Sequence, residues 1–278
     1  MTAPETGRAE APAGGIDTHA HVFRSDLPMA ADARYRPSAD APLETYLRLL
    51  DGEGLDGGVL VQPSFLGTDN RHLVYCLRLA AGRLKGIAVV APDIGSQDLD
   101  RLAAAGVVGI RLNLVGRALP RLDEEPWPRL FANLAGRSWQ VEVHAEGSAW
   151  PALLPGLCRA GLPIVIDHFG RPESTLGTSC SGFRALLAAM VEAPIHVKLS
   201  GPYRFGADAA RDCAAALLDR VGPSRLVWGS DWPWTQQPPG LSYRRTLAWL
   251  EDWVADAAAR RAILVDTPRA LFGFPPPA

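Results

Sequence analysis

Eight short apolar segments alternate with stretches of helical spacing along almost the whole chain of 278 residues. The apolar segments are continuous rather than interrupted at every second residue, which indicates strands buried on both faces, as in a parallel sheet. Eight strand–helix units in roughly 260 residues have the size of a (β/α)8 barrel. We therefore expect one α/β domain, a single (β/α)8 TIM barrel, over residues 15–278. The expected strands are 15–23, 57–62, 84–90, 107–114, 140–144, 163–167, 195–199 and 225–229, and the expected helices are 42–50, 71–81, 98–105, 126–135, 149–160, 183–192, 208–221 and 241 to about 272.

A doubly wound open sheet is the alternative fold for the same order of elements. Such a sheet normally has a glycine-rich phosphate loop directly after its first strand. In this chain that position holds His19-Ala-His21. The barrel is therefore the favoured prediction.

The first 14 residues are rich in Ala, Pro and Gly and contain no apolar stretch of the signal-peptide kind. We expect residues 1–14 to form a disordered tail. No apolar run approaches the ~20 residues that a membrane helix needs. The net charge of −2 argues against nucleic acid or an anionic membrane as a partner.

The cysteines are scattered and form no Cys-x-x-Cys pair. This usage predicts free thiols in a reducing cytoplasm rather than a disulfide framework or a zinc ribbon. Monomer and homodimer both remain open. The four cysteines are Cys76, Cys158, Cys180 and Cys213.

Two histidines one residue apart, His19 and His21, close the first predicted strand. Alternate side chains of a strand share a face, so both imidazoles should point the same way and could hold one ion or one polar group. The alternative is that they only fill hydrogen-bonding niches. Other predicted strands also end in side chains of the ligand type, namely His144, His168 and Asp231.

A barrel makes a prediction of its own, because catalytic residues sit at the C-terminal ends of its strands. Arg111 and Lys198 lie near the ends of the fourth and seventh strands, whereas His72 and His196 lie elsewhere and are expected to be structural. Further candidates are in the loops that follow the strands. These are Ser64, Thr68, Arg117 and Arg204.

Five motifs in this order resemble those of the amidohydrolase superfamily, in its branch of small barrel enzymes without a binuclear site. Within that branch the chain resembles 2-pyrone-4,6-dicarboxylate lactonase and its relatives among sugar- and muconolactone hydrolases. The resemblance extends from Gly15 to about Phe272. The motifs are Asp17-Thr-His-Ala-His21, Gln62-Pro-Ser-Phe-Leu-Gly-Thr-Asp-Asn70, Gly109-Ile-Arg-Leu-Asn113, Ile166-Asp-His-Phe-Gly-Arg-Pro172 and Trp228-Gly-Ser-Asp-Trp-Pro233.

The resemblance implies an anionic lactone as substrate, with its carboxylates held by Arg111, Arg117 and Arg204. A planar guanidinium binds a carboxylate through two hydrogen bonds, which suits this task. Ser64 and Thr68 would add neutral hydrogen bonds. The alternatives are solvated surface charges for the arginines and ordinary turn chemistry for Ser64 and Thr68.

One position departs from the dicarboxylate lactonase, in which the fifth strand ends in a tyrosine and no metal is used. Here that residue is His144. In metal-using relatives a histidine at this position binds one divalent ion. The implied ligands are His19, His21, His144 and Asp231, which suit Zn²⁺ or Mn²⁺. Metal-independent hydrolysis, with His144 contacting the substrate, stays open.

The implied reaction is hydrolysis of a cyclic ester, with Asp231 as the general base that takes a proton from water. His19, His21 and His168, or the ion, would stabilise the oxyanion. Structural roles for Asp231, as a turn cap, and for His168 are the alternatives. Two other functions also remain open: a mononuclear zinc decarboxylase of an aromatic or muconate-type acid, and a non-catalytic carboxylate-binding barrel that would keep binding without Asp231.

Overall fold

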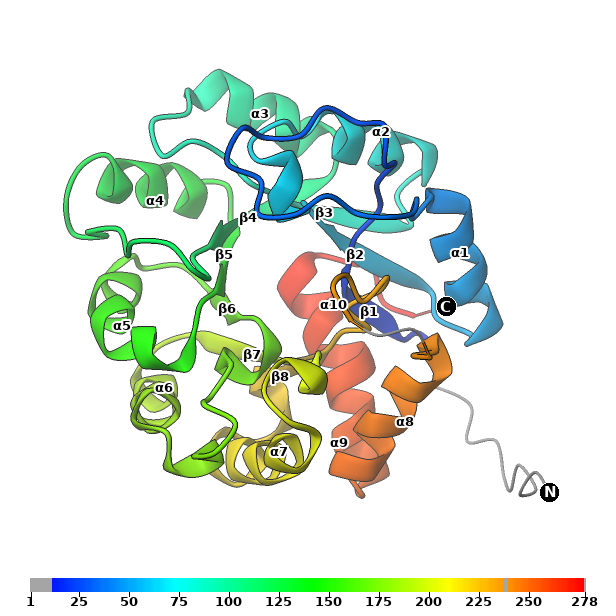
Figure 1. Ribbon diagram of the computed structural model, residues 1–278, viewed down its shortest axis with the longest axis vertical. Coiled ribbons are helices and arrows are strands. Elements are labelled where there is room, and N and C mark those ends of the chain that lie inside the picture. Colours follow the sequence, from blue (N-terminus) through cyan, green and yellow to red (C-terminus); the bar gives the residue numbers. More distant parts are fainter. Residues whose placement is uncertain (1–11, 238–239, 278) are drawn as a thin grey trace.

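The computed structural model describes residues 12–237 and 240–277 and has the predicted architecture. Eight parallel strands follow one another in the order β1 to β8, and the helices surround them (Figure 1). The strands are β1 (Ile16–Ala20), β2 (Gly57–Val61), β3 (Leu84–Ala88), β4 (Val107–Asn113), β5 (Gln140–His144), β6 (Ile164–Ile166), β7 (Ile195–Leu199) and β8 (Leu226–Trp228). The helices are α1 (Leu43–Gly52), α2 (Arg71–Leu79), α3 (Ser96–Ala104), α4 (Trp127–Ala135), α5 (Trp150–Arg159), α6 (Ser181–Glu192), α7 (Ala207–Val221), α8 (Tyr243–Trp253), α9 (Ala257–Arg261) and α10 (Thr267–Phe272).

The barrel closes where β1 meets β8 and the segment that follows it. Ala20 forms a parallel bridge with Trp232, and the Thr18 hydroxyl donates to the carbonyl of Trp228 at 2.7 Å. The amide of His21 donates to the carbonyl of Trp232 at 2.8 Å. These contacts extend past the three-residue strand β8, so the site residues that follow it are fixed against β1.

The predicted strands are all present, but several end earlier than the sequence pattern indicated. His21 lies beyond the end of β1. His168 begins a short 3-10 turn after β6, with φ of 51°. The long helical region predicted from residue 241 is divided into α8, α9, a π-helical turn (Ala262–Asp266) and α10. The division follows from a second cap, because the side chain of Asp256 accepts a hydrogen bond from the amide of Ala259 at 2.8 Å and starts a new helix.

A bulge in β1 separates two side chains that strand alternation would place together. Asp17 pairs with Gly58 and Ala20 with Leu60, so three steps on β1 correspond to two on β2. As a result Asp17 points outward, toward Tyr46 of α1 and Tyr243 of α8. His19, two residues later, points into the barrel.

Apolar residues fill two layers. The larger cluster lies between the sheet and the helices and contains Leu60 and Tyr46. A smaller cluster contains Val59 and Val61, which alternate with Leu60 along β2 and therefore face the barrel interior, with Phe272 of α10 packed against them. The floor of the barrel is thus apolar.

The chain ahead of β1 is described from Pro12 onward. Pro12 accepts a hydrogen bond from the amide of Gly15 at 3.2 Å, and the carbonyl of Gly14 accepts one from Arg269 at 2.9 Å. The rest of the predicted disordered tail, residues 1–11, lies outside the described residues. No helix in the described part of the chain is long and apolar enough to span a membrane. The four cysteines are free thiols, as predicted.

Candidate active site

Three imidazoles surround one carboxylate oxygen at the C-terminal mouth of the barrel. Asp231 Oδ1 lies 3.8 Å from Nε2 of His19. The Nε2 atoms of His21 and His168 each lie 3.9 Å from the same oxygen. His19, His168 and Asp231 are 0% exposed and His21 is 7% exposed. Histidines at the ends of β1 and β6 or just after them therefore meet the aspartate that follows β8, as the sequence predicted.

The two oxygens of Asp231 have different surroundings. Oδ2 accepts from the hydroxyl of Tyr203 at 2.6 Å and from Arg204, at 2.8 Å from Nε and 2.6 Å from Nη2. Oδ1 is buried and has no hydrogen-bond partner in the described chain. Burial by itself would raise the pKa of Asp231, but the charge of Arg204 and the hydrogen bond from Tyr203 lower it, so the pKa lies below its ordinary value. Asp231 is thus ionised, with one free oxygen.

The backbone of Asp231 is held in the left-handed region, with φ of 56°. Its amide donates to the carbonyl of His19 at 2.8 Å, and its carbonyl accepts from the amide of Trp234 at 2.8 Å. Non-glycine residues in this region cost free energy and are concentrated at functional sites. The strained turn directs the carboxylate toward the histidines.

Hydrogen bonds at Nδ1 determine what two of the imidazoles present to the site. His21 Nδ1 faces the carbonyl of Val61 at 2.7 Å. A carbonyl only accepts, so Nδ1 of His21 carries the proton and Nε2 has a free lone pair. His144 Nδ1 instead faces Nη2 of Arg111 at 3.1 Å. Because a guanidinium only donates, neutral His144 carries its proton on Nε2. His21 therefore offers an acceptor and His144 a donor.

Burial keeps all four histidines uncharged. Burial lowers the pKa of His19 to about 4, and neighbouring Lys198 adds to the effect. Burial also lowers the pKa of His21 to about 3, with a further contribution from His19. Burial followed by the charge of Arg111 lowers the pKa of His144, and burial followed by Arg204 lowers that of His168. The site therefore contains neutral imidazoles near pH 7.

A layer of buried charges supports the site from below. Lys198 Nζ lies 2.6 Å from Glu142 Oε1 and 3.0 Å from His19 Nδ1. Arg111 binds Asp167 Oδ2 at 2.9 Å from both Nε and Nη2. Burial raises the pKa of Glu142 to about 7, although Lys198 opposes the rise. Lys198 contacts His19 and Arg111 contacts His144 at Nδ1, while Glu142 pairs with Lys198 and Asp167 with Arg111.

The donor atoms fit a small cation. His19, His21 and Asp231 each offer one ligand atom, and these atoms lie within 4.8 Å of one another. Nε2 of His19 and Oδ1 of Asp231 are buried without a partner in the described residues. Nδ1 of His19 lies 3.2 Å from Asp167 Oδ1 and can donate its proton to it, which leaves the lone pair of Nε2 for an ion. Imidazole nitrogen and carboxylate oxygen are the usual ligands of Zn²⁺, at bond lengths of about 2 Å. A small contraction of the cluster would suffice, so the residues fit one divalent ion. His144, the fourth ligand that the resemblance implied, directs a protonated Nε2 at the site.

A small cavity that is open to solvent lies beside this cluster, with a volume of about 30 Å³. The loop after β1 covers it, because the Tyr35 hydroxyl donates to Thr235 at 2.9 Å and Arg34 donates to the carbonyl of Val115 at 3.0 Å. The cavity is lined by His21, Arg34, Tyr35, Pro63, Ser64, Arg111, Asn113, His144, Arg204, Thr235 and Gln236.

Two of the predicted substrate contacts lie elsewhere. Arg117 is 40% exposed and pairs with Asp32 at 2.6 Å. Thr68 is exposed and does not line the cavity. Arg111, Arg204, Ser64 and His144 do line it.

Sequence reasoning missed Tyr203, Asp167, Glu142, Arg34 and Tyr35 as parts of the site. Only two of them carried a usable signal: Asp167 precedes His168 within a motif, and Tyr203 precedes Arg204. Glu142 lies inside an apolar run, where its inward direction is visible only with the barrel. Arg34 and Tyr35 belong to a loop without periodicity.

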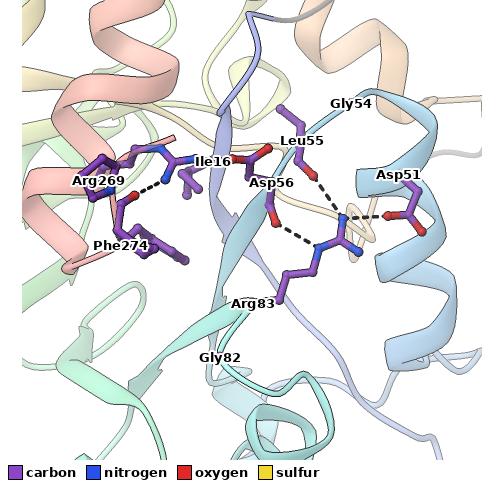
Figure 2. A pocket seen from close by; sticks show the side chains of 11 residues that line it. Ile16, Asp51, Gly54, Leu55, Asp56, Gly82, Arg83, Arg269 and Phe274 are labelled. Atoms are coloured by element: carbon purple, nitrogen blue, oxygen red, sulfur yellow. Dashed lines mark hydrogen bonds and ion pairs between the residues drawn. The ribbon is translucent and has the colours of Figure 1, made fainter. Parts of the chain in front are cut away.

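A second cavity, of about 580 Å³, lies at the opposite end, where the strands begin (Figure 2). Its arginines are already engaged. Arg83 donates to the carbonyls of Asp56 and Leu55 at 3.0 and 3.1 Å and pairs with Asp51 at 2.7 Å. Arg269 binds Asp56 and the carbonyl of Gly14. Because these arginines are paired, we interpret the residues around this cavity as contributing to stability rather than to catalysis.

Comparison with known proteins shows the family to which this chain belongs. A family model described as "Amidohydrolase" matches residues 16–274. A solved structure from Pseudomonas putida is 42% identical, with a TM-score of 0.88, over 94% of this chain and 98% of the other. A second, from Acinetobacter baumannii with citric acid bound, is 36% identical, with a TM-score of 0.91, over 94% of this chain and 100% of the other. The names of both structures refer to 2-pyrone-4,6-dicarboxylic acid hydrolase.

A curated relative, the 4-sulfomuconolactone hydrolase of Hydrogenophaga intermedia, is 31% identical over 94% of this chain and 89% of its own length. Dihydroxybenzoate decarboxylases are more distant. They are 15% and 16% identical, a level at which the likeness concerns the fold alone.

Proposed function

This chain belongs to the amidohydrolase family, and from that premise and the geometry of its cavity we propose that it hydrolyses the ester bond of a carboxylated lactone. One observation carries the proposal: the carboxylate of Asp231 is buried and ionised, and its Oδ1 has no partner among three neutral imidazoles. An acceptor in this position suits a general base for water. Relatives whose names refer to lactone hydrolysis support the reaction class.

The acidic groups of the substrate would be bound by Arg111 and Arg204. Both line the cavity, and the contacts of both guanidiniums to neighbouring residues use Nε and Nη2. Within the described residues their Nη1 groups make no hydrogen bond, so these groups can bind a ligand. Charge-assisted hydrogen bonds of this kind select carboxylate or sulfonate over neutral substituents. Ser64 can add a neutral hydrogen bond from the cavity wall.

In the proposed reaction, Asp231 Oδ1 takes a proton from water while the water oxygen bonds to the lactone carbonyl carbon. The carbonyl oxygen becomes an oxyanion, which the Nε2–H of His144 stabilises, together with His168. The bond between the carbonyl carbon and the ring oxygen then breaks. The ring oxygen receives the proton from Asp231, which restores the carboxylate and yields an open-chain acid.

A divalent ion, Zn²⁺ or Mn²⁺, would be held by His19, His21 and Asp231. When bound, such an ion supplies Lewis-acid polarisation of a carbonyl and lowers the pKa of water. We assign His144 to the substrate rather than to the ion, since Arg111 occupies its Nδ1 and leaves the proton on Nε2.

Hydrolysis assays with 2-pyrone-4,6-dicarboxylate, a muconolactone and a neutral sugar lactone test the proposal. We expect the dicarboxylate or the muconolactone to be turned over best. Arg111→Met should raise KM for the dicarboxylate about tenfold to a hundredfold, since a hydrogen bond to a charged group is lost. Arg117→Met, the matched control at an exposed ion pair, should change it less than about threefold.

Preferential turnover of the neutral lactone would contradict the proposed substrate class, and absence of turnover of all three would contradict the reaction. Elemental analysis of the same preparation, before and after chelation, tells whether hydrolysis depends on an ion.

A further inference from the structure

Tyr203 belongs to none of the motifs on which the resemblance rests, yet it touches the proposed general base. Its hydroxyl donates to Asp231 Oδ2 at 2.6 Å. It follows β7 in a short 3-10 turn (Pro202–Arg204), and its ring packs against Trp249 of α8 at 6.0 Å between centroids. Tyr203 is thus fixed to the wall of the barrel.

The turn that positions Tyr203 needs a glycine before it. Gly201 has φ of 57°, and a Cβ at this position would lie 2.9 Å from His168 Nδ1 and 3.2 Å from Arg204 Nε. The first distance is shorter than real Cβ contacts, and the second would require the Arg204 side chain to move by a few tenths of an ångström. The absence of a side chain at Gly201 therefore lets Tyr203 and Arg204 approach Asp231 together.

The two donors on Oδ2 differ in their access to a ligand. Arg204 lines the cavity, so an acidic group of a substrate can bind it. Tyr203 does not line the cavity. When an anion shares the guanidinium, the attraction between Arg204 and Asp231 is divided between two acidic groups. The hydroxyl of Tyr203 is not shared in this way.

We propose that Tyr203 is the positioning residue of Asp231: it holds Oδ2 while an acidic substrate occupies Arg204, so that Oδ1 continues to face the histidines. The inference rests on the proposed function and adds a residue to it. Its consequence is specific. Tyr203 matters most for substrates whose acidic group engages Arg204, and it acts on kcat rather than on KM.

Tyr203→Phe tests the inference, because it removes the hydroxyl and keeps the ring that packs against Trp249 and Arg204. We expect kcat for an acidic lactone to fall about tenfold, with KM within about twofold, since one hydrogen bond to a charged group is lost. For a neutral lactone kcat should fall less than about threefold. The ratio of the two values is measured on one preparation, so it is independent of the folded fraction.

Tyr243→Phe is the matched control, since it removes a hydroxyl that donates to another buried carboxylate, Asp17 Oδ2, at 2.7 Å. It should leave the ratio unchanged. An equal loss of kcat for both lactones in Tyr203→Phe would overturn the inference while the proposed function stands. Failure of the wild type to hydrolyse any lactone would count against the proposed function instead.

Crystal structures with citrate as a carboxylate probe give a second readout that needs no turnover. In the wild type we expect a citrate carboxylate on Arg204, with the bond from Tyr203 to Asp231 kept. In Tyr203→Phe with citrate, the Asp231 carboxylate should rotate away from the histidines. An unchanged carboxylate in the variant would show that Arg204 alone holds it, and the inference would be wrong.

Discussion

Two buried aspartates lie next to each other in this barrel and have opposite surroundings. Asp17 of β1 and Asp231 after β8 are both 0% exposed, and both accept a hydrogen bond from a tyrosine. Ser230 links them, because its amide and hydroxyl donate to Asp17 at 2.9 and 2.6 Å while the next residue is Asp231 itself.

Both oxygens of Asp17 are engaged. Oδ1 accepts from the amides of His19 and Ser230, and Oδ2 accepts from the hydroxyls of Tyr46, Tyr243 and Ser230. A Cβ on Gly58 would lie 2.1 Å from the Tyr46 hydroxyl, so this approach requires a glycine. Within the part of the chain that the structure describes, Asp231, in contrast, accepts hydrogen bonds at Oδ2 and none at Oδ1.

Whether both oxygens have hydrogen-bond partners distinguishes a structural carboxylate from a reactive one. A buried polar atom without a partner costs free energy, so folds rarely retain one for stability. Asp17 joins β1, β8, α1 and α8 and leaves no acceptor free. Asp231 keeps a free acceptor beside three imidazoles, which indicates that the fold preserves it for a ligand.

Removing the proton acceptor gives the largest expected effect. Asp231→Asn keeps the shape of the side chain but cannot take a proton from water, so kcat/KM should fall about a thousandfold, within the range for a general base. Steady-state kinetics on the preferred lactone measures it. A loss below tenfold would show that Asp231 is not the general base. The contrast between a reactive Asp231 and a structural Asp17 would then also be wrong.

Removing Asp17, the structural carboxylate, should lower the stability of the protein rather than its activity. Asp17→Ala removes the carboxylate to which five buried groups donate, and of these the Ser230 hydroxyl alone also donates to the carbonyl of His19 among the described residues; we expect the free energy of unfolding to fall by at least about 3 kcal/mol. Urea unfolding measures this loss, and kcat of the folded fraction should fall less than tenfold. Unchanged stability would mean that the hydroxyls find other acceptors.

Mild acid should lower the free energy of unfolding through the site of Asp231. Among the described residues, imidazoles surround Asp231 but do not contact the carboxylate of Asp17. Burial lowers the pKa of His19 to about 4 and that of His21 to about 3, whereas both have ordinary values near 6.5 when unfolded. The unfolded chain therefore binds more protons in this range, and stability falls as the pH decreases. For the two histidines the loss between pH 7 and pH 6 is about 1 kcal/mol.

Urea unfolding of chelator-treated protein at the two pH values tests this, with the double variant His19→Gln and His21→Gln as control. The variant should lose less stability than the wild type over the same interval. An equal loss in both would place the titrating groups elsewhere.

Much of this molecule could be predicted from sequence because the relevant signals are local. Continuous apolar runs determined the strands, their number determined the barrel, and the ends of the runs identified His19, His21, His144, His168 and Asp231. Strand periodicity is encoded over a few residues, so it survives without knowledge of distant contacts. The same reasoning ranked Arg111, Arg117 and Arg204 together, because it sees residue type and position but not direction.

Only the tertiary structure decided which oxygen of Asp231 is free, which nitrogen of His144 carries a proton, and which arginine faces the cavity. Each depends on a partner far away in the chain: Arg204 is 27 residues from Asp231, and Arg111 is 33 residues from His144. The bulge that turns Asp17 outward likewise arises from the pairing of β1 with β2. The hydrogen-bond partners of loop residues depend on how the barrel brings the strand ends together. These partners follow no periodicity that could be recognised in the sequence.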